Sequence, residues 1–408
     1  MSRKKSIGLI SLPEVRYDCI CCAECCGPWE IPVSAEEKSD LQGACSGKEI
    51  FQKGISSPIV LRKKFDGNCV FLDESNLCVI HKTKGEGSKP LGCRLYPFEF
   101  CKWDDGITSF YCRMDCWGTG FPVLDRKDQK KIKLESSAFE KEIRNSSPVS
   151  ANKYSDKLIL DTRRMRFIAD GYRRIIEHGK GSISAKILAC AEMLQFYSRK
   201  ENCGDLLKAD VSFVEKSVSI YERNISRLEE TVKISPNPDL PTNFFFRQLL
   251  TGFVRRDEDY LISPSVFKRI VRAFHVAAFC LGATRLDSLG NRLLKFENDV
   301  AKPDSCNGIS DLLRSYFSGR ISSMHFMSRP CLNFSFEEGM RHLICSALSV
   351  GAISKEFPKS DPMLPIRVVD HNFSSSAFFT MFQSDVCRRK ITDPVPLSCL
   401  LKELFGNS

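Results

Sequence analysis

The chain has 408 residues, of which 42% are hydrophobic and 27% charged, and its formal net charge is +10. This composition excludes a disordered or fibrous chain, and the length allows two or three domains. Residues 151–408 hold 37 basic against 29 acidic side chains, but their basic runs are short and interleaved with apolar residues. That pattern favours an ordinary solvated surface over a stripe that binds nucleic acid.

The N-terminal segment begins with basic residues but has only a short apolar run, Ile7 to Leu12. A secretory signal needs roughly 7–15 apolar residues and a small-residue cleavage site, and neither is present. No stretch approaches the roughly 20 apolar residues of a transmembrane helix. We therefore expect a cytoplasmic protein with no membrane partner, whose thiols stay reduced.

Twelve of the twenty cysteines lie within the first 116 residues, and their spacing is typical of metal ligands. Cys19, Cys22 and Cys25 form a C-x-x-C-x-x-C run, which Cys26 follows directly. Such a run supplies three thiolates from one tight loop, as cubane iron–sulfur clusters require. Because adjacent cysteines make a strained disulfide, Cys25 and Cys26 favour metal binding over a disulfide framework.

This run needs a fourth ligand from elsewhere, because Trp29 stands where ferredoxin and radical-SAM spacings require the next cysteine. The predicted metal ligands are Cys19, Cys22, Cys25, Cys26, Cys69, Cys78, Cys93 and Cys116. The same set fits one or two Cys₄ zinc sites, or a Cys₃His site with His81, which is otherwise a surface histidine. Cys101 and Cys112 are alternative ligands, and Cys45, in a polar loop, is expected to be a free thiol.

The identity of the metal rests on the cysteine run. Its spacing favours an iron–sulfur cluster, whereas zinc usually takes paired C-x-x-C knuckles, which occur only at this end of the chain. Nearby apolar side chains either shield a cluster from water or form the small core of this region, namely Trp29, Phe71, Leu72, Tyr96 and Phe98. Iron–sulfur is the favoured cofactor and zinc the alternative.

Domain organisation follows from the uneven distribution of cysteine, proline and glycine. Residues 1–124 form a cysteine-rich head of loops and short strands, to which metal binding can add folding free energy on the order of 10 kcal/mol. Residues 125–156 are charged and polar and are predicted to be a linker. Residues 157–408 are predicted to form a helical body. The expected fold class is mainly α, with a small irregular α+β metal-binding head before that body.

Apolar residues in the body recur at helical spacing. A long series from Val211 to Val232 predicts one helix, with Ser212 and Glu215 as its capping box. Shorter helical patterns occupy residues 158–177, 185–198, 243–254, 310–317 and 397–405.

Two more helices are predicted from their start signals. Ser263 and Pro264 open one of them. Ser335 with Glu338 caps the other, which should end at Gly351.

Other chemistry is weakly represented. We find no G-x-S-x-G, no H-E-x-x-H and no glycine-rich loop that binds nucleotide phosphates. Cys190, Cys280 and Cys345 lie in apolar helical runs and are expected to be core residues, as is the His342–Cys345 pair. Catalytic residues therefore cannot be named from the sequence.

The cysteine elements resemble those of a known family. The run ending in Cys25-Cys26, then Cys69-Val-Phe-Leu, Cys78-Val-Ile-His and Cys93-Arg-Leu-Tyr-Pro-Phe, is similar to the YkgJ-type CxxCxxCC family. That family is described as a zinc- or iron-chelating domain. The match departs at His81, where tyrosine is usual, and at Cys116-Trp-Gly-Thr-Gly, which replaces C-P-G-x-G. The resemblance covers under a third of the chain and implies metal binding by the head.

A second resemblance bears on activity. Flagellin lysine N-methylases are similar in plan, with a cysteine-rich head ending in two cysteines and a nearby tryptophan, then a helical body. Cys26-Gly-Pro-Trp29 and Tyr96-Pro97 look like their elements, although Phe98 stands where arginine is usual. This resemblance implies methyl transfer from S-adenosylmethionine to a protein lysine. Two hypotheses follow, a binding module with a structural metal and a methyltransferase with a protein substrate.

Overall fold

The computed structural model describes most of the chain. The described residues are 8–9, 16–17, 20, 22–23, 26–27, 30–42, 49–53, 59–65, 67–120, 147–254, 266–286, 308–358, 360–374, 379 and 382–406. Within them the fold is mainly α with a small α+β region, as the sequence predicted. No helix among these residues is long and apolar enough to cross a membrane.

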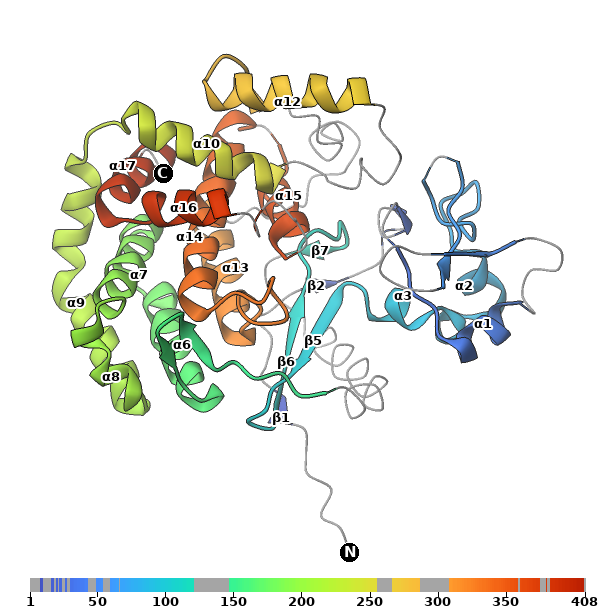
Figure 1. The fold of residues 1–408 in the computed structure, drawn as a ribbon, viewed down its shortest axis with the longest axis horizontal. Helices are drawn as coiled ribbons and strands as arrows, with labels where there is room; N and C mark the ends of the chain where they lie inside the picture. The colour runs from blue at the N-terminus through green and yellow to red at the C-terminus, as the bar shows by residue number, and fades with distance from the viewer. Residues whose placement is uncertain are drawn as a thin grey trace, which may run out of the picture.

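The described residues between 20 and 95 form a small unit, here called the cysteine lobe, which lies to one side of the helices (Figure 1). Its elements are α1 (Ala35–Gln42), β3 (Phe51–Gln52), β4 (Val60–Leu61), α2 (Val79–Lys84), η2 (Glu86–Ser88) and α3 (Leu91–Leu95). Strands β3 and β4 pair antiparallel. The lobe has a core of its own, whose buried residues are Ile31, Val33, Leu41, Ile50, Leu61, Cys69, Phe71 and Ile80.

A β-hairpin follows the lobe. Strands β5 (Phe98–Lys102) and β6 (Ile107–Cys112) pair antiparallel, and β1 (Gly8–Leu9) adds to β6 in parallel. The Trp103 indole N–H donates to the Ser109 hydroxyl at 2.8 Å, and that hydroxyl donates to the Ser323 carbonyl at 2.6 Å. The hairpin therefore packs on the helical body, although it precedes the predicted boundary at residue 124.

The body contains the main core. Its described elements are β8 (Lys153–Ser155), β9 (Leu158–Ile159), α6 (Thr162–Glu177), α7 (Ile183–Tyr197), η3 (Lys200–Asn202), α8 (Gly204–Leu207), α9 (Val211–Ile234), α10 (Leu240–Val254), α12 (Val266–Cys280), α13 (Ile309–Ser323), α14 (Phe336–Glu356), α15 (Leu364–Phe373), α16 (Phe382–Ile391) and α17 (Pro394–Phe405). Helix α14 is buried along most of its length, with α7, α13, α15, α16 and α17 around it (Figure 1). This core extends into the hairpin, since Phe98, Trp103 and Met114 belong to it.

Several helix boundaries differ from the sequence predictions. The capping box Ser335–Glu338 is confirmed, but α14 continues past Gly351 to Glu356. Gly351 does not end the helix; it allows close packing, because a Cβ there would lie 2.5 Å from the Phe405 ring. The predicted cap of α9, Ser212, is wrong: the N-cap is Asp210, two residues earlier, whose side chain accepts the Ser212 N–H.

The predicted domain limits fall partly outside the described residues. Ser263 and Pro264 lie there, as do residues 125–146 of the predicted linker. Residues 147–156 are described, and Ala151 and Tyr154 are buried, with Tyr154 stacked on Phe336. We therefore propose a linker only before residue 147, and the division of the chain near residue 124 stays a prediction.

Candidate metal centre

Six of the eight predicted metal ligands lie within the described residues. They are Cys22, Cys26, Cys69, Cys78, Cys93 and Cys116. Cys19 and Cys25 lie outside the described residues, as do Cys45 and Trp29. The structure divides the six described cysteines into two groups.

The first group is here called the four-thiol cluster and consists of Cys26, Cys69, Cys78 and Cys93. Cys69 is buried in the lobe core, and the other three pack against that core. Backbone contacts tie their segments together. The Cys69 N–H donates to the Cys26 carbonyl at 2.8 Å, and Cys78 forms a β-bridge with Leu72. Four separate segments therefore bring their cysteines to one core.

A tight turn returns the chain from Cys69 to Cys78. The Asp73 carboxylate accepts the backbone N–H groups of Ser75 and Leu77, both at 2.9 Å. Such an aspartate-capped turn satisfies backbone donors locally and fixes the loop. The turn places Cys78 at the N-cap of α2.

Cys93 reaches the cluster from α3. The first N–H of that helix, on Leu91, donates to the Glu37 carboxylate of α1 at 2.6 Å. Glu37 also closes a capping box with Ser34, since each side chain accepts the other residue's N–H. Helix α3 is thus held against α1, which fixes the position of Cys93.

The charges around the cluster suit a bound cation. Burial raises the pKa of the Cys93 thiol, and the neighbouring Cys69, Cys26 and Cys78 raise it further. Burial also raises the pKa of Cys69, while the Phe71 N–H and Lys63 act in the opposite direction. Four thiolates this close repel one another, and a coordinated cation removes that penalty and deprotonates them.

The donor set fits zinc or iron, since both prefer several thiolates. Among the described residues, no group of three or more Cys, His, Asp or Glu side chains is arranged to hold a metal ion. The assignment of the four cysteines as ligands is therefore a proposal, developed below. His81 is exposed on α2, as the surface interpretation predicts.

The second group consists of Cys22 and Cys116, the two described members of the predicted set that are not part of the lobe core. Burial raises the pKa of the Cys116 thiol to about 12; the Gly118 N–H acts in the opposite direction, and Asp115 and Cys22 make smaller contributions that raise it. Strand β2 (Arg16–Tyr17) pairs antiparallel with β7 (Thr119–Gly120). This pairing joins the chain just before the cysteine run to the chain just after Cys116.

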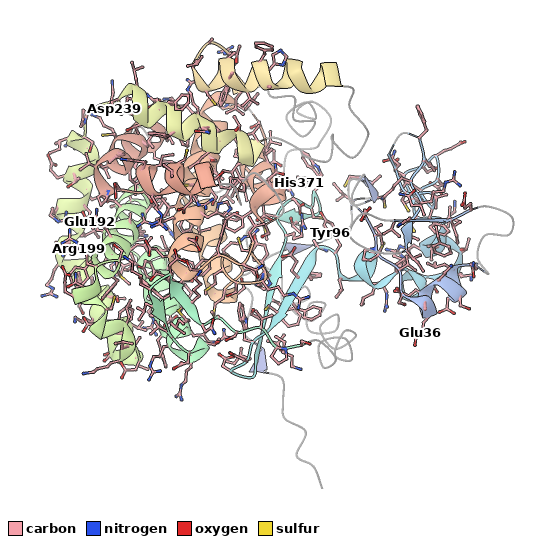
Figure 2. The ribbon with its side chains drawn as sticks, in the orientation of Figure 1. Glu36, Tyr96, Glu192, Arg199, Asp239 and His371 are labelled. Carbon is pink, nitrogen blue, oxygen red and sulfur yellow. The ribbon has the colours of Figure 1, made fainter. Side chains whose placement is uncertain are left out.

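Body residues hold this junction. The buried Asp115 carboxylate accepts from Arg113 at 2.6 Å and lies 3.1 Å from the His371 ring. Arg113, the largest favourable influence, and His371 keep the pKa of Asp115 low despite its burial. Tyr96 donates to the same carboxylate at 3.3 Å, and Figure 2 shows Tyr96 and His371 on the side of the body that faces the lobe.

Sequence reasoning missed the contribution of α15. Arg367, Asp370 and His371 are spaced i, i+3 and i+4, so they share one face of that helix. All three contact residues 111–119: Arg367 bonds to backbone carbonyls there, and Asp370 accepts the Met114 N–H at 2.6 Å. The sequence contains a signal for this role, because ionisable residues recur at helical spacing in a segment that is otherwise mostly apolar.

The other described cysteines lie outside the lobe core, although Cys116, after burial, is among the groups that raise the pKa of the Cys112 thiol. Cys101 and Cys112, the alternative ligands, are buried in the core shared by the hairpin and the body. Cys190, Cys280 and Cys345 are buried, which confirms their interpretation as core residues. His342 is also buried, with its Nε2 2.9 Å from the Phe373 carbonyl.

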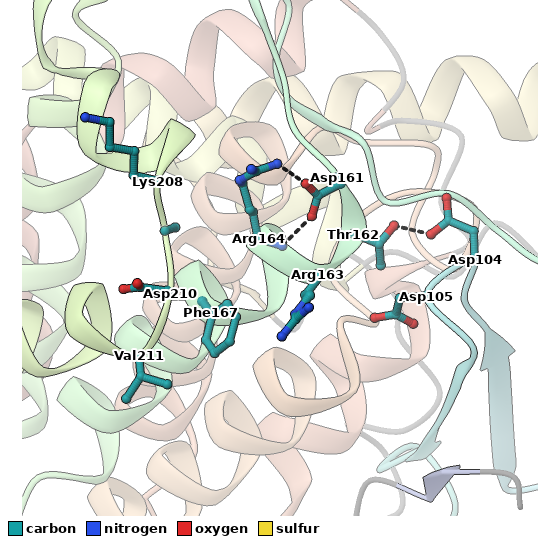
Figure 3. Close-up of a pocket in the computed structure, with 11 residues that line it drawn as sticks. Asp104, Asp105, Asp161, Thr162, Arg163, Arg164, Phe167, Lys208, Asp210 and Val211 are labelled. Atoms are coloured by element: carbon teal, nitrogen blue, oxygen red, sulfur yellow. Dashed lines mark hydrogen bonds and ion pairs between the residues drawn. The ribbon is translucent and has the colours of Figure 1, made fainter.

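Two cavities lie in the described part of the body. One cavity, of about 780 Å³, lies where α6 and α9 begin (Figure 3). Several of the charged side chains that line it already have partners: Arg164 pairs with Asp161, and Asp104 accepts from the Thr162 hydroxyl. Another, of about 310 Å³, lies between α7 and α9 and has a mainly apolar lining. Among the described residues that line these two cavities there is no cysteine.

Comparisons with known proteins agree with the geometry. The uncharacterized protein MJ0939 of Methanocaldococcus jannaschii is 30% identical over 137 residues. The match covers 33% of this chain and 46% of that protein, so the chain spans about half the length of this relative. No solved structure matches the chain. Residues 18–114 match the model of the family CxxCxxCC, described as "Putative zinc- or iron-chelating domain".

Proposed function

We propose that the protein binds a metal ion through Cys26, Cys69, Cys78 and Cys93, and that the ion holds the cysteine lobe together. The carrying observation is that four separate segments bring these thiols to one small core. Eight buried residues make a limited core, and a tetrathiolate metal site adds folding free energy on the order of 10 kcal/mol. The proposed role of this metal is structural.

The metal in this cluster is a single zinc or iron ion. Tetrahedral sulfur coordination is typical of both. The cubane spacing that favoured an iron–sulfur cluster belongs to one continuous run, whereas these four ligands come from separated positions. Four thiolates around one such ion would fill its coordination sphere and leave no open position for substrate.

The test is metal analysis of protein that has been expressed and purified without oxygen. Cys69→Ser and Cys93→Ser should each lose one equivalent of zinc or iron and lower the unfolding temperature of the lobe. Cys203→Ser is the matched control, because Cys203 is a half-buried cysteine of the body and bonds only backbone carbonyls among the contacts observed. If the Cys69→Ser and Cys93→Ser proteins keep their metal, the ligand set is wrong.

Methyl transfer from S-adenosylmethionine to a protein lysine is the alternative function, with the body as the surface for a protein partner. It rests on the resemblance to flagellin lysine N-methylases alone, and no feature of the described residues adds to it. Calorimetric titration of the metal-loaded protein with S-adenosylmethionine tests it directly. Binding that requires the intact cysteine lobe would favour an enzyme over a structural module.

A further inference from the structure

The cavity of about 310 Å³ between α7 and α9 lies on the side of the body turned away from the cysteine lobe, where Figure 2 shows Glu192, one of its lining residues. Small side chains leave this space open, since Ala189 of α7 and Ser217 of α9 both line it. Phe196 and Ile220 also line it and are 50% and 41% exposed, so the cavity opens to solvent. Its volume falls at the lower end of the range of small-molecule pockets, roughly 300–1,000 Å³.

The charged residues that line the cavity form two ion pairs, one near each end. Lys216 pairs with Asp205 at 2.6 Å, and Arg227 donates to Glu192 at 2.9 Å. On α9 the two cations are separated by about 16 Å, at the helical rise of roughly 1.5 Å per residue. Because each cation already has a carboxylate partner, the cavity offers no unpaired charge to an ionised ligand. Its mainly apolar lining favours an uncharged one.

Tyr197 supplies a polar group that the fold leaves unused. It lines the cavity and is 5% exposed, and its hydroxyl has no hydrogen-bond partner among the described residues. Burial, and to a smaller extent the Asp205 carboxylate, raises the pKa of Tyr197 to about 12. The hydroxyl therefore keeps its proton at neutral pH and can donate a hydrogen bond to an acceptor atom of a ligand.

We propose that this cavity binds an uncharged molecule with an unbranched hydrocarbon tail and a carbonyl group at one end, such as an acyl ester or amide. The tail lies between α7 and α9, and the carbonyl oxygen accepts from the Tyr197 hydroxyl near the Asp205–Lys216 pair. The volume and the length together describe a narrow cavity. Such a cavity suits an extended tail better than a helix of a partner protein, which is roughly 10–12 Å across.

The test is calorimetric titration of the whole purified protein with methyl octanoate, which should bind as one molecule per chain. Methyl butyrate has four fewer methylene groups and should bind more weakly by on the order of a hundredfold, since each buried methylene contributes about 0.8 kcal/mol. Octanoate should bind about tenfold more weakly than the methyl ester, because its carboxylate finds no unpaired cation in the cavity.

Paired variants locate the bound ester. Tyr197→Phe removes only the hydroxyl and should weaken binding several-fold. Its matched control is Tyr316→Phe, because Tyr316 is buried in the body but does not line the cavity. Phe196→Ala removes part of the apolar wall and should weaken binding about tenfold. Its control is Phe244→Ala, because Phe244 is also an exposed ring that contacts a neighbouring ring, on α10.

Both controls should leave the affinity for methyl octanoate unchanged, and far-ultraviolet circular dichroism checks that each variant folds. Equal affinities for methyl octanoate and methyl butyrate, or for the ester and octanoate, would overturn the proposed ligand class. Unchanged affinity in both Tyr197→Phe and Phe196→Ala would place the ligand elsewhere. Wild-type protein that binds no methyl octanoate refutes the proposal and leaves the cavity as a contact surface for a partner's helix. None of these outcomes bears on the metal-binding proposal, whose ligands lie in the cysteine lobe.

Discussion

The buried ion pair between Arg320 and Asp370 allows a quantitative prediction about the contact that attaches the hairpin to the body. The two side chains are 2% and 0% exposed. Asp370 also accepts from the Tyr111 hydroxyl at 2.8 Å and from the Met114 N–H at 2.6 Å. Asp370→Asn keeps the shape but removes the charge, so Arg320 stays buried without its counterion. Breaking a buried pair in this way costs about 3–5 kcal/mol.

The assay is urea unfolding followed by circular dichroism, with midpoints converted through a shared m value. Tyr111→Phe removes one hydrogen bond to the same carboxylate and should cost about 1 kcal/mol. Asp170→Asn is the matched control, because Asp170 pairs with Arg173 and Arg174 at 30% exposure and should cost under about 1 kcal/mol. If Asp370→Asn is no more destabilising than Asp170→Asn, this contact does not depend on the charge of Asp370.

The fold makes two further predictions. Burial lowers the pKa of His325 to about 3 and that of His342 well below its usual value, so the folded state binds fewer protons than the unfolded state. Stability should therefore fall as the pH drops below about 6.5, by up to about 1.4 kcal/mol per pH unit for each histidine, and His342→Gln should flatten the slope. A Cβ on Gly339 would lie 2.0 Å from the Phe326 carbonyl oxygen, whereas one on Gly351 would meet only the Phe405 ring. Gly339→Ala should thus be more destabilising than Gly351→Ala, where about 1–3 kcal/mol is expected, and the opposite order would contradict this packing.

Local sequence patterns predicted the helices because the apolar spacing and the capping residues that define a helix lie within one segment of the chain. The apolar series from Val211 to Val232 and the Ser335–Glu338 capping box each involve neighbouring turns of one helix. The cysteine spacing likewise predicted the candidate ligands, but it did not predict their grouping. Cys26 follows the run at residues 19–25 directly, and it packs at the lobe core with Cys69, whose N–H donates to its carbonyl. That contact joins segments far apart in the chain, which spacing does not encode.

Local sequence patterns also could not predict that the hairpin packs on the body. Ser109 and Ser323 bond across more than two hundred residues, as do Met114 and Asp370. Residues 98–114 have the cysteines and short strands that characterise the head, so composition assigns them there. Their buried side chains nevertheless pack into the body's core, because the hairpin alone has too little apolar surface to fold.

This division of cores predicts what metal removal does. The lobe has a separate core of eight residues and depends on its metal, whereas the hairpin and the helices share one larger core. A chelator should therefore speed amide hydrogen exchange at the Cys69 and Val79 N–H groups, whose bonds close the cluster's loops. The amides of β5, β6 and α14 should stay protected, because none of their hydrogen bonds involves the lobe core. If exchange in β5 and β6 accelerates along with the lobe while α14 is unchanged, the hairpin belongs energetically to the head, as its sequence position predicted.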